Sequence, residues 1–153
     1  MPLLRSASIL ALAAVGMVSN LSAEPSCPVT QPNQNTPPGE RAGSSHYGNG
    51  SLWTALPPAG RVVFSPGDPW HVLPDGSLSM KFPWWRAVSG PLTIEGRRLD
   101  APAAPLRASI PEGYGDTGVQ ATALIFPTEG CWEVTGKMGH TNLTFVVKVE
   151  QRK

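Results

Sequence analysis

The fold is decided by Gly118–Glu150, GVQATALIFPTEGCWEVTGKMGHTNLTFVVKVE, which predicts three consecutive strands joined by two short turns. The last strand has the clearest pattern. From Leu143 onward apolar and polar side chains alternate, which is the two-residue period of a strand with one buried face. Proline, glycine and short polar residues at 127–130 and 139–140 supply the turns.

The middle strand, 131–138, separates its two faces by the same alternation. Trp132 falls on the apolar face and Cys131 on the opposite one, so we expect Trp132 in the core and Cys131 outside it. The first strand, 120–126, carries apolar residues on both faces, which predicts a central strand covered on both sides. The predicted core stripe consists of Trp132, Val134, Phe145 and Val147.

Upstream of this stretch the chain contains further short strand patterns separated by turn residues. They are predicted at 51–56, 61–64, 77–85, 92–94 and 106–110. After the N-terminal segment, no ten residues keep a helical period free of proline and glycine. About eight short strands, with turns every eight to twelve residues, predict an all-β fold with a single antiparallel β-sandwich.

The first 23 residues have the layout of a secretory signal peptide, with a basic residue, the apolar run Ile9–Val18 and small residues up to Ala23. The run is too short to span a bilayer, which takes about 20 apolar residues. We expect cleavage after Ala23, no transmembrane helix in the mature chain, and a secreted, periplasmic or cell-envelope location. A lipid anchor on Cys27 is the rival interpretation, but residues 24–26 do not fit a lipobox.

The charge of the mature chain is balanced. The full sequence of 153 residues has 12 Lys+Arg and 11 Asp+Glu, and loss of Arg5 with the signal makes the two numbers equal. A balanced chain argues against a nucleic acid or an anionic membrane as a partner attracted by net charge. The remaining length suits one domain with a core of its own.

Two cysteines, Cys27 and Cys131, remain in a chain exported to an oxidising compartment, which predicts a disulfide between them. The bridge would close a loop of about 100 residues, which the chain-entropy model credits with up to about 4.7 kcal/mol. Because Cys131 is expected to face outward, the bridge would hold a proline-rich arm, 24–46, across the outside of a sheet. Two free thiols or an intermolecular pair are the alternatives.

Four motifs carry a resemblance to known proteins. They are Tyr47-Gly48-Asn49-Gly50-x-Leu52-Trp53-Thr54, Lys81-Phe82-Pro83-Trp84-Trp85-Arg86, Gly96-Arg97-Arg98-Leu99-Asp100 and Pro127-Thr128-Glu129-Gly130-Cys131-Trp132-Glu133-Val134. With them the chain resembles small exported bacterial proteins of uncharacterised function, and its Gly-Cys-Trp hairpin is similar to the end of bacterial immunoglobulin-like domains. The resemblance implies an immunoglobulin-like β-sandwich over 47–153 and brings no catalytic residue.

No stretch of the sequence carries a strong signal for catalysis or for a cofactor. Residues 113–118 match G-x-G-x-x-G by letter, but Pro111 precedes them and a strand follows, so we interpret them as a glycine-rich loop. No serine sits in a G-x-S-x-G elbow. Metal-ligand spacing is missing among the three histidines, which are His46, His71 and His140. We therefore predict no catalytic residue, no metal and no cofactor.

The candidate ligand-binding residues are Trp84, Trp85 and Arg86. Alternation sends Trp84 and Trp85 to opposite faces, so at least one indole is expected outside the core. An exposed tryptophan beside an arginine stacks on sugar rings or anchors a peptide. The alternative is that Trp85 packs under the proline-rich arm. A second basic segment, 96–100, is interpreted as a turn with a local ion pair, with anion recognition as its alternative.

Together these patterns predict an exported, non-catalytic binding or structural module of the bacterial cell envelope or extracellular space, whose partner is an unknown protein or glycan. The alternative is an enzyme or metal-handling protein whose site is assembled only by the fold. Histidines or carboxylates gathered in one pocket would favour the alternative, and a flat surface of tryptophan and arginine would favour the binding module.

Overall fold

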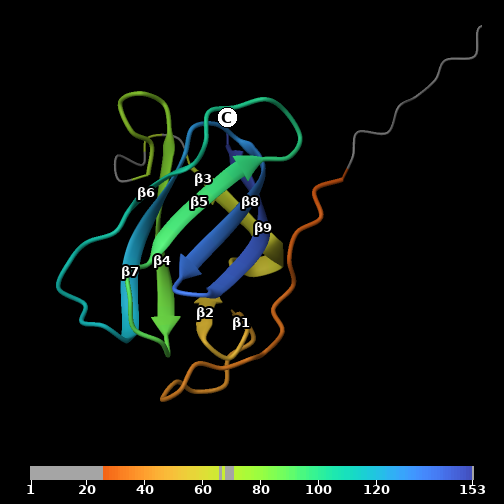
Figure 1. Ribbon diagram of the computed structural model, residues 1–153. Coiled ribbons are helices and arrows are strands. Elements are labelled where there is room, and N and C mark those ends of the chain that lie inside the picture. The colour runs from red at the N-terminus through yellow and green to blue at the C-terminus, as the bar shows by residue number, and fades with distance from the viewer. Residues whose placement is uncertain (1–25, 66, 68–70, 153) are drawn as a thin grey trace, which may run out of the picture.

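The computed structural model describes residues 26–65, 67 and 71–152, so the predicted signal peptide at 1–23 and its cleavage site lie outside the described residues. The described residues form nine strands and one short 3-10 helix, η1 (Pro58–Gly60). The strands build two sheets packed face to face, as Figure 1 shows. The predicted all-β sandwich is confirmed. Within the described ranges, no helix has the length and apolar character needed to cross a membrane.

One sheet has five strands and the other has four. The five-stranded sheet has the order β1 (His46–Gly48), β2 (Leu52–Ala55), β4 (Leu78–Arg86), β7 (Gly118–Phe126) and β6 (Arg107–Ser109). The four-stranded sheet has the order β3 (Arg61–Phe64), β9 (Thr141–Gln151), β8 (Gly130–Met138) and β5 (Thr93–Arg98). In Figure 1 the strands β5, β8 and β9 lie in front of β4 and β7.

The three strands predicted over Gly118–Glu150 are present as β7, β8 and β9. Of these three strands, β8 and β9 pair as a hairpin, but β7 and β8 do not. The turn at 127–129 carries the chain from the five-stranded sheet to the four-stranded one. The inward stripe is as predicted. Its members are all 0–1% exposed: Trp132, Val134, Phe145 and Val147.

The prediction that the strand at 120–126 is covered on both sides is wrong. The inward side chains of β7 are buried, and Leu124 is 1% exposed, but its outward side chains are not covered. Val119 is 45% exposed, and Ala121 and Ala123 are half-buried. The reason is that a two-layer sandwich gives each strand one buried face.

The prediction of a purely antiparallel sandwich is wrong at one pair of strands, because β3 runs parallel to β9. After β2 the chain leaves the five-stranded sheet and turns through η1, where Ala59 has φ 52° and Gly60 has φ 67°. It then joins the edge of the four-stranded sheet in the same direction as β9. The described residues contain nine strands and not about eight because His46–Gly48, which was not predicted as a strand, pairs with β2 as β1.

Aromatic side chains from both sheets hold the sandwich together. From β4, Phe82 stacks on Phe145 of β9 with ring centroids 5.1 Å apart, and Trp84 lies 6.0 Å from the same ring. Trp84 also lies over Gly136 of β8, where a Cβ atom would be only 2.4 Å from a ring carbon. The sheets therefore come this close because position 136 has no side chain.

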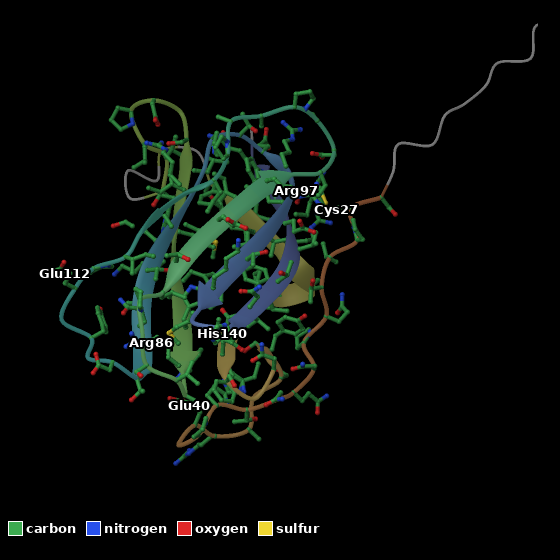
Figure 2. All side chains as sticks on the ribbon, viewed as in Figure 1. Cys27, Glu40, Arg86, Arg97, Glu112 and His140 are labelled. Carbon is green, nitrogen blue, oxygen red and sulfur yellow. A yellow bond between two sulfur atoms is a disulfide. The ribbon has the colours of Figure 1, made fainter. Side chains whose placement is uncertain are left out.

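The N-terminal arm is attached to the four-stranded sheet through the predicted disulfide, which is present between Cys27 and Cys131 with Cα atoms 5.4 Å apart. Next to it, Thr30 N–H donates to Val146 O, and Val146 N–H donates to Thr30 Oγ1. Cys131 faces away from the core and is only 1% exposed, because the arm covers it. Figures 1 and 2 show the arm descending along the β9 side of the domain from Cys27.

Removing the disulfide should destabilise the domain. We expect Cys27→Ala/Cys131→Ala to lose about 2–4 kcal/mol of unfolding free energy, the usual contribution of a bridge that closes a long loop. Urea denaturation without reductant measures this loss. Thr30→Val is the matched control, because it removes one hydrogen bond at the same attachment and should cost only about 1 kcal/mol. A double variant as stable as the parent would contradict the prediction.

Candidate functional site

The five-stranded sheet presents an outward face whose central side chains are small or apolar. We define the outer face as the outward side chains of β4, β7 and β6, which are Ser79, Lys81, Pro83 and Trp85, then Val119, Ala121, Ala123 and Ile125, then Arg107 and Ser109. Neighbouring strands place these residues side by side in the register Lys81↔Ala123, Pro83↔Ala121 and Trp85↔Val119. An uncovered apolar surface of this kind marks an interaction site more often than an ordinary wet surface does.

The outward side of the four-stranded sheet is different, because ion pairs cover it. Arg97 Nε lies 2.8 Å from Glu133 Oε1, and Lys137 pairs with Glu95. By contrast, the strands β4, β6 and β7 contain no aspartate or glutamate. The outward side of the four-stranded sheet thus carries paired charges, whereas the only charged side chains on the strands of the outer face are basic.

Trp85 lies at one end of the outer face, half-buried under the arm. Its Nε1 donates a hydrogen bond to Glu40 Oε1 at 3.1 Å, and its ring meets the His46 ring edge-on at 5.7 Å. Trp53 of β2 is its cross-strand neighbour. Figure 2 places Glu40 at the same end of the domain as Arg86, below the end of β4. The arm therefore covers part of the indole and leaves part of it open.

The other two candidate residues do not join Trp85 on a surface. Trp84 is 0% exposed within the core, and Arg86 is 6% exposed on the same inward side of β4. Strand alternation explains both positions, since Trp84 and Arg86 are two residues apart and Trp85 lies between them. The expected surface of tryptophan beside arginine is therefore not formed, and of the three only Trp85 can touch a partner.

Arg86 holds the glycine-rich loop 111–118 in place. Its Nη2 donates to three backbone carbonyls, those of Tyr114 at 3.0 Å, Gly115 at 2.9 Å and Thr117 at 3.3 Å. Its Nε donates to a fourth carbonyl, that of Gly118. Among the described residues no carboxylate forms an ion pair with Arg86. The loop connects β6 to β7 with no helix after it, so the G-x-G-x-x-G letters form a loop between strands, as interpreted.

Arg86 also lines a groove of about 510 Å³ between this loop and residues 90–92. The carboxylates of Glu112 and Asp116 lie on the rim of the same groove. Arg86 already donates to backbone carbonyls, and the two exposed acids add negative charge at the rim. The groove therefore does not favour an anion. We therefore assign Arg86 to the folding of the loop.

The basic segment 96–100 forms the local ion pair that was expected. Arg98 Nε lies 2.7 Å from Asp100 Oδ1, and Lys148 Nζ lies 3.4 Å from Asp100 Oδ2. Burial raises the pKa of Asp100, but hydrogen bonds from Arg98, the Cys131 backbone and Lys148, with the charge of Arg98, outweigh it and lower the pKa to about 2. The cluster lies beside the disulfide and supports its attachment.

The histidines lie in separate elements. His46 is in β1, His71 precedes β4, and His140 is in the turn between β8 and β9. Within the part of the chain that the structure describes, no group of three or more histidine, cysteine, aspartate or glutamate side chains is placed to hold a metal ion.

Sequence reasoning missed most of the outer face, although its signal was visible. Ala121, Ala123 and Ile125 belong to the second apolar side recognised in the strand at 120–126, but that side was assigned to a covered position. Val119 lies just outside the predicted strand. Lys81 and Pro83 were not assigned to the site at all.

No protein-family model matches the chain, and no curated protein sequence matches it. The feature of the domain that bears most on function is therefore the difference between its two outward surfaces.

The Asp100 cluster should make stability depend on acid pH. Because folding lowers the pKa of Asp100 from its usual value near 3.9, its contribution is complete above about pH 4 and is lost as the pH falls through about 2. Asp100→Asn should therefore be less stable than the parent at pH 5, with the difference shrinking towards pH 2. Urea denaturation across this range tests it. Asp116→Asn, at an exposed loop position, should show no such trend.

Replacing Arg86 should release the glycine-rich loop. Arg86→Met keeps most of the apolar stem but removes the donors to four carbonyls, so we expect a loss of about 2–3 kcal/mol. Amide hydrogen exchange should also become faster at residues 114–118. Arg97→Met is the control, since Arg97 has a side chain 72% exposed in a surface ion pair and should cost less than about 1 kcal/mol. Equal losses in the two variants would refute this role.

Proposed function

We propose that the chain is an exported, non-catalytic binding module of the bacterial cell envelope or extracellular space, and that it contacts its partner through the outer face. The observation that carries the proposal is the contrast between the two outward surfaces. One surface is covered by ion pairs such as Arg97–Glu133. The other has Val119 at 45% exposure beside half-buried alanines, with no acidic residue on its strands.

We further propose that the domain is immunoglobulin-like, in agreement with its resemblance to small exported bacterial proteins. Support comes from the strand order, in which β2-β4-β7-β6 pack over β9-β8-β5. This is the arrangement of strands A, B, E and D over G, F and C in immunoglobulin constant-type domains. The disulfide differs, because it ties the arm to β8 from outside and does not cross between the sheets.

Export has two independent lines of support. The predicted signal peptide directs the chain out of the cytoplasm, and a disulfide between Cys27 and Cys131 suits an oxidising compartment. The proposed partner is a protein or glycan of that compartment. The domain contributes a rigid sheet surface to this contact, because the strands behind the outer face are fixed by the aromatic core.

A charge placed in the outer face should weaken binding without unfolding the domain. We expect Val119→Asp to weaken retention of partners from envelope extract, or of glycans on a panel, by about tenfold, because the new carboxylate must lose water on contact. Val63→Asp is the matched control, since Val63 is 43% exposed on β3, at the edge of the other sheet. The proposal fails if the two variants bind equally well, or if Val119→Asp loses binding only because it unfolds.

A further inference from the structure

We infer that the partner of the outer face is a protein whose apolar surface carries a carboxylate opposite Lys81, and not a glycan. The inference rests on the proposed function and narrows it to one class of partner. Three properties of the outer face support it. They are the lack of hydrogen-bonding side chains at its centre, the position of Lys81, which pairs with no carboxylate among the described residues, and the contact of the chain's own arm with Trp85.

The first property is the shortage of donors and acceptors around Trp85. A sugar ring stacked on an indole also needs polar groups to bind its hydroxyls. On the strands of the outer face, the side chains next to Trp85 are those of Pro83, Ala121 and Val119, none of which forms hydrogen bonds. On its other side the polar neighbour His46 is buried against the indole ring. The Nε1 of Trp85 already donates to Glu40. A glycan here would leave its hydroxyls without partners, at a cost in free energy, whereas an apolar protein surface would not.

The second property is the charge of Lys81. The donor side chains at the two ends of the outer face already have carboxylate partners. Arg107 Nη2 lies 2.9 Å from Asp75 Oδ2, and Trp85 donates to Glu40. Lys81 lies between them and is exposed, and no carboxylate among the described residues pairs with it. One carboxylate on the partner, facing Lys81, would give this lysine an ion pair and fix the register of the complex.

The third property is that a carboxylate of the chain's own arm already contacts the outer face. Glu40 brings a carboxylate to the polar atom of Trp85 at 3.1 Å. The strands of the outer face have no acidic residue of their own, and the two carboxylates at its ends, Asp75 and Glu40, already bind Arg107 and Trp85. A second copy of this face therefore offers Lys81 no unengaged carboxylate. The occupant is therefore a different protein surface.

The size of the outer face indicates a transient complex. Seven residues of β4, from Ser79 to Trp85, span about 20 Å, and three strands give a width of about 10 Å between the outermost strand axes. Such a patch is smaller than the standard interface, which buries about 800 Å² on each partner. The affinity should therefore depend strongly on the single ion pair.

The test titrates defined probes into the exported protein. Binding is measured by the shifts of the protein's backbone amide signals in NMR spectra. The first probe is a short disulfide-closed β-hairpin peptide with an apolar face and two glutamates at its rim. The second is the same hairpin with lysines in place of the glutamates. A neutral and an acidic oligosaccharide form the third set. We expect the glutamate hairpin to shift the amides of Val119, Ala121 and Ala123, and to bind about fivefold more tightly than the lysine hairpin.

Lys81→Glu supplies the decisive comparison. The variant should reverse the preference, so that the lysine hairpin binds the more tightly, while the amides of Glu133 and Thr135 on the other sheet stay unmoved in all titrations. Shifts at the outer face with an oligosaccharide and with neither hairpin would overturn this inference and leave the proposed function standing. Hairpins that bind without regard to charge would also overturn it. No shift at the outer face with any probe would overturn both.

Discussion

The contact of Trp84 and Phe82 with Phe145, over Gly136, is the constraint on which the rest of the structure depends. It joins the two sheets, with ring centroids 5.1 Å and 6.0 Å apart, in a space that any side chain at position 136 would close. Because β4 alternates, fixing Trp84 inside also fixes its neighbours. Trp85 and Lys81 must face outward, and Arg86 must face inward at the end of the strand, where it binds the carbonyls of the glycine-rich loop.

The arm and the disulfide decide which surfaces remain available. Starting at Cys27, the arm hydrogen-bonds to Val146 on β9, then Asn33 bonds to Gly48 on the edge of β1 and Asn35 binds the Trp53 indole. Exposed strand edges invite unwanted pairing. The arm protects the edge strand β1 and the part of β9 that β3 does not pair with. It reaches the outer face at Trp85, through Glu40 and His46, and leaves most of that face open.

Features set by neighbours in the sequence could be predicted, and features set by distant contacts could not. The alternation over 131–138 and from Leu143 identified the core stripe, and the same alternation with the expected compartment identified the disulfide. The parallel pairing of β3 with β9 could not be predicted, because it depends on a change of sheet at η1. The surroundings of Arg86 were equally hidden, since its carbonyl partners lie 28 or more residues away along the chain.

The wrong prediction for β7 bears on function. Val119, Ala121, Ala123 and Ile125 give this strand the composition of one covered on both faces, and the described residues cover only one. A surface that only had to meet water would gain from charged side chains, as the four-stranded sheet does with Arg97–Glu133. Apolar side chains become favourable there when a second surface removes them from water. The strand pattern and the proposed binding role are therefore two consequences of the same composition, because in the proposed complex a partner would supply the second cover.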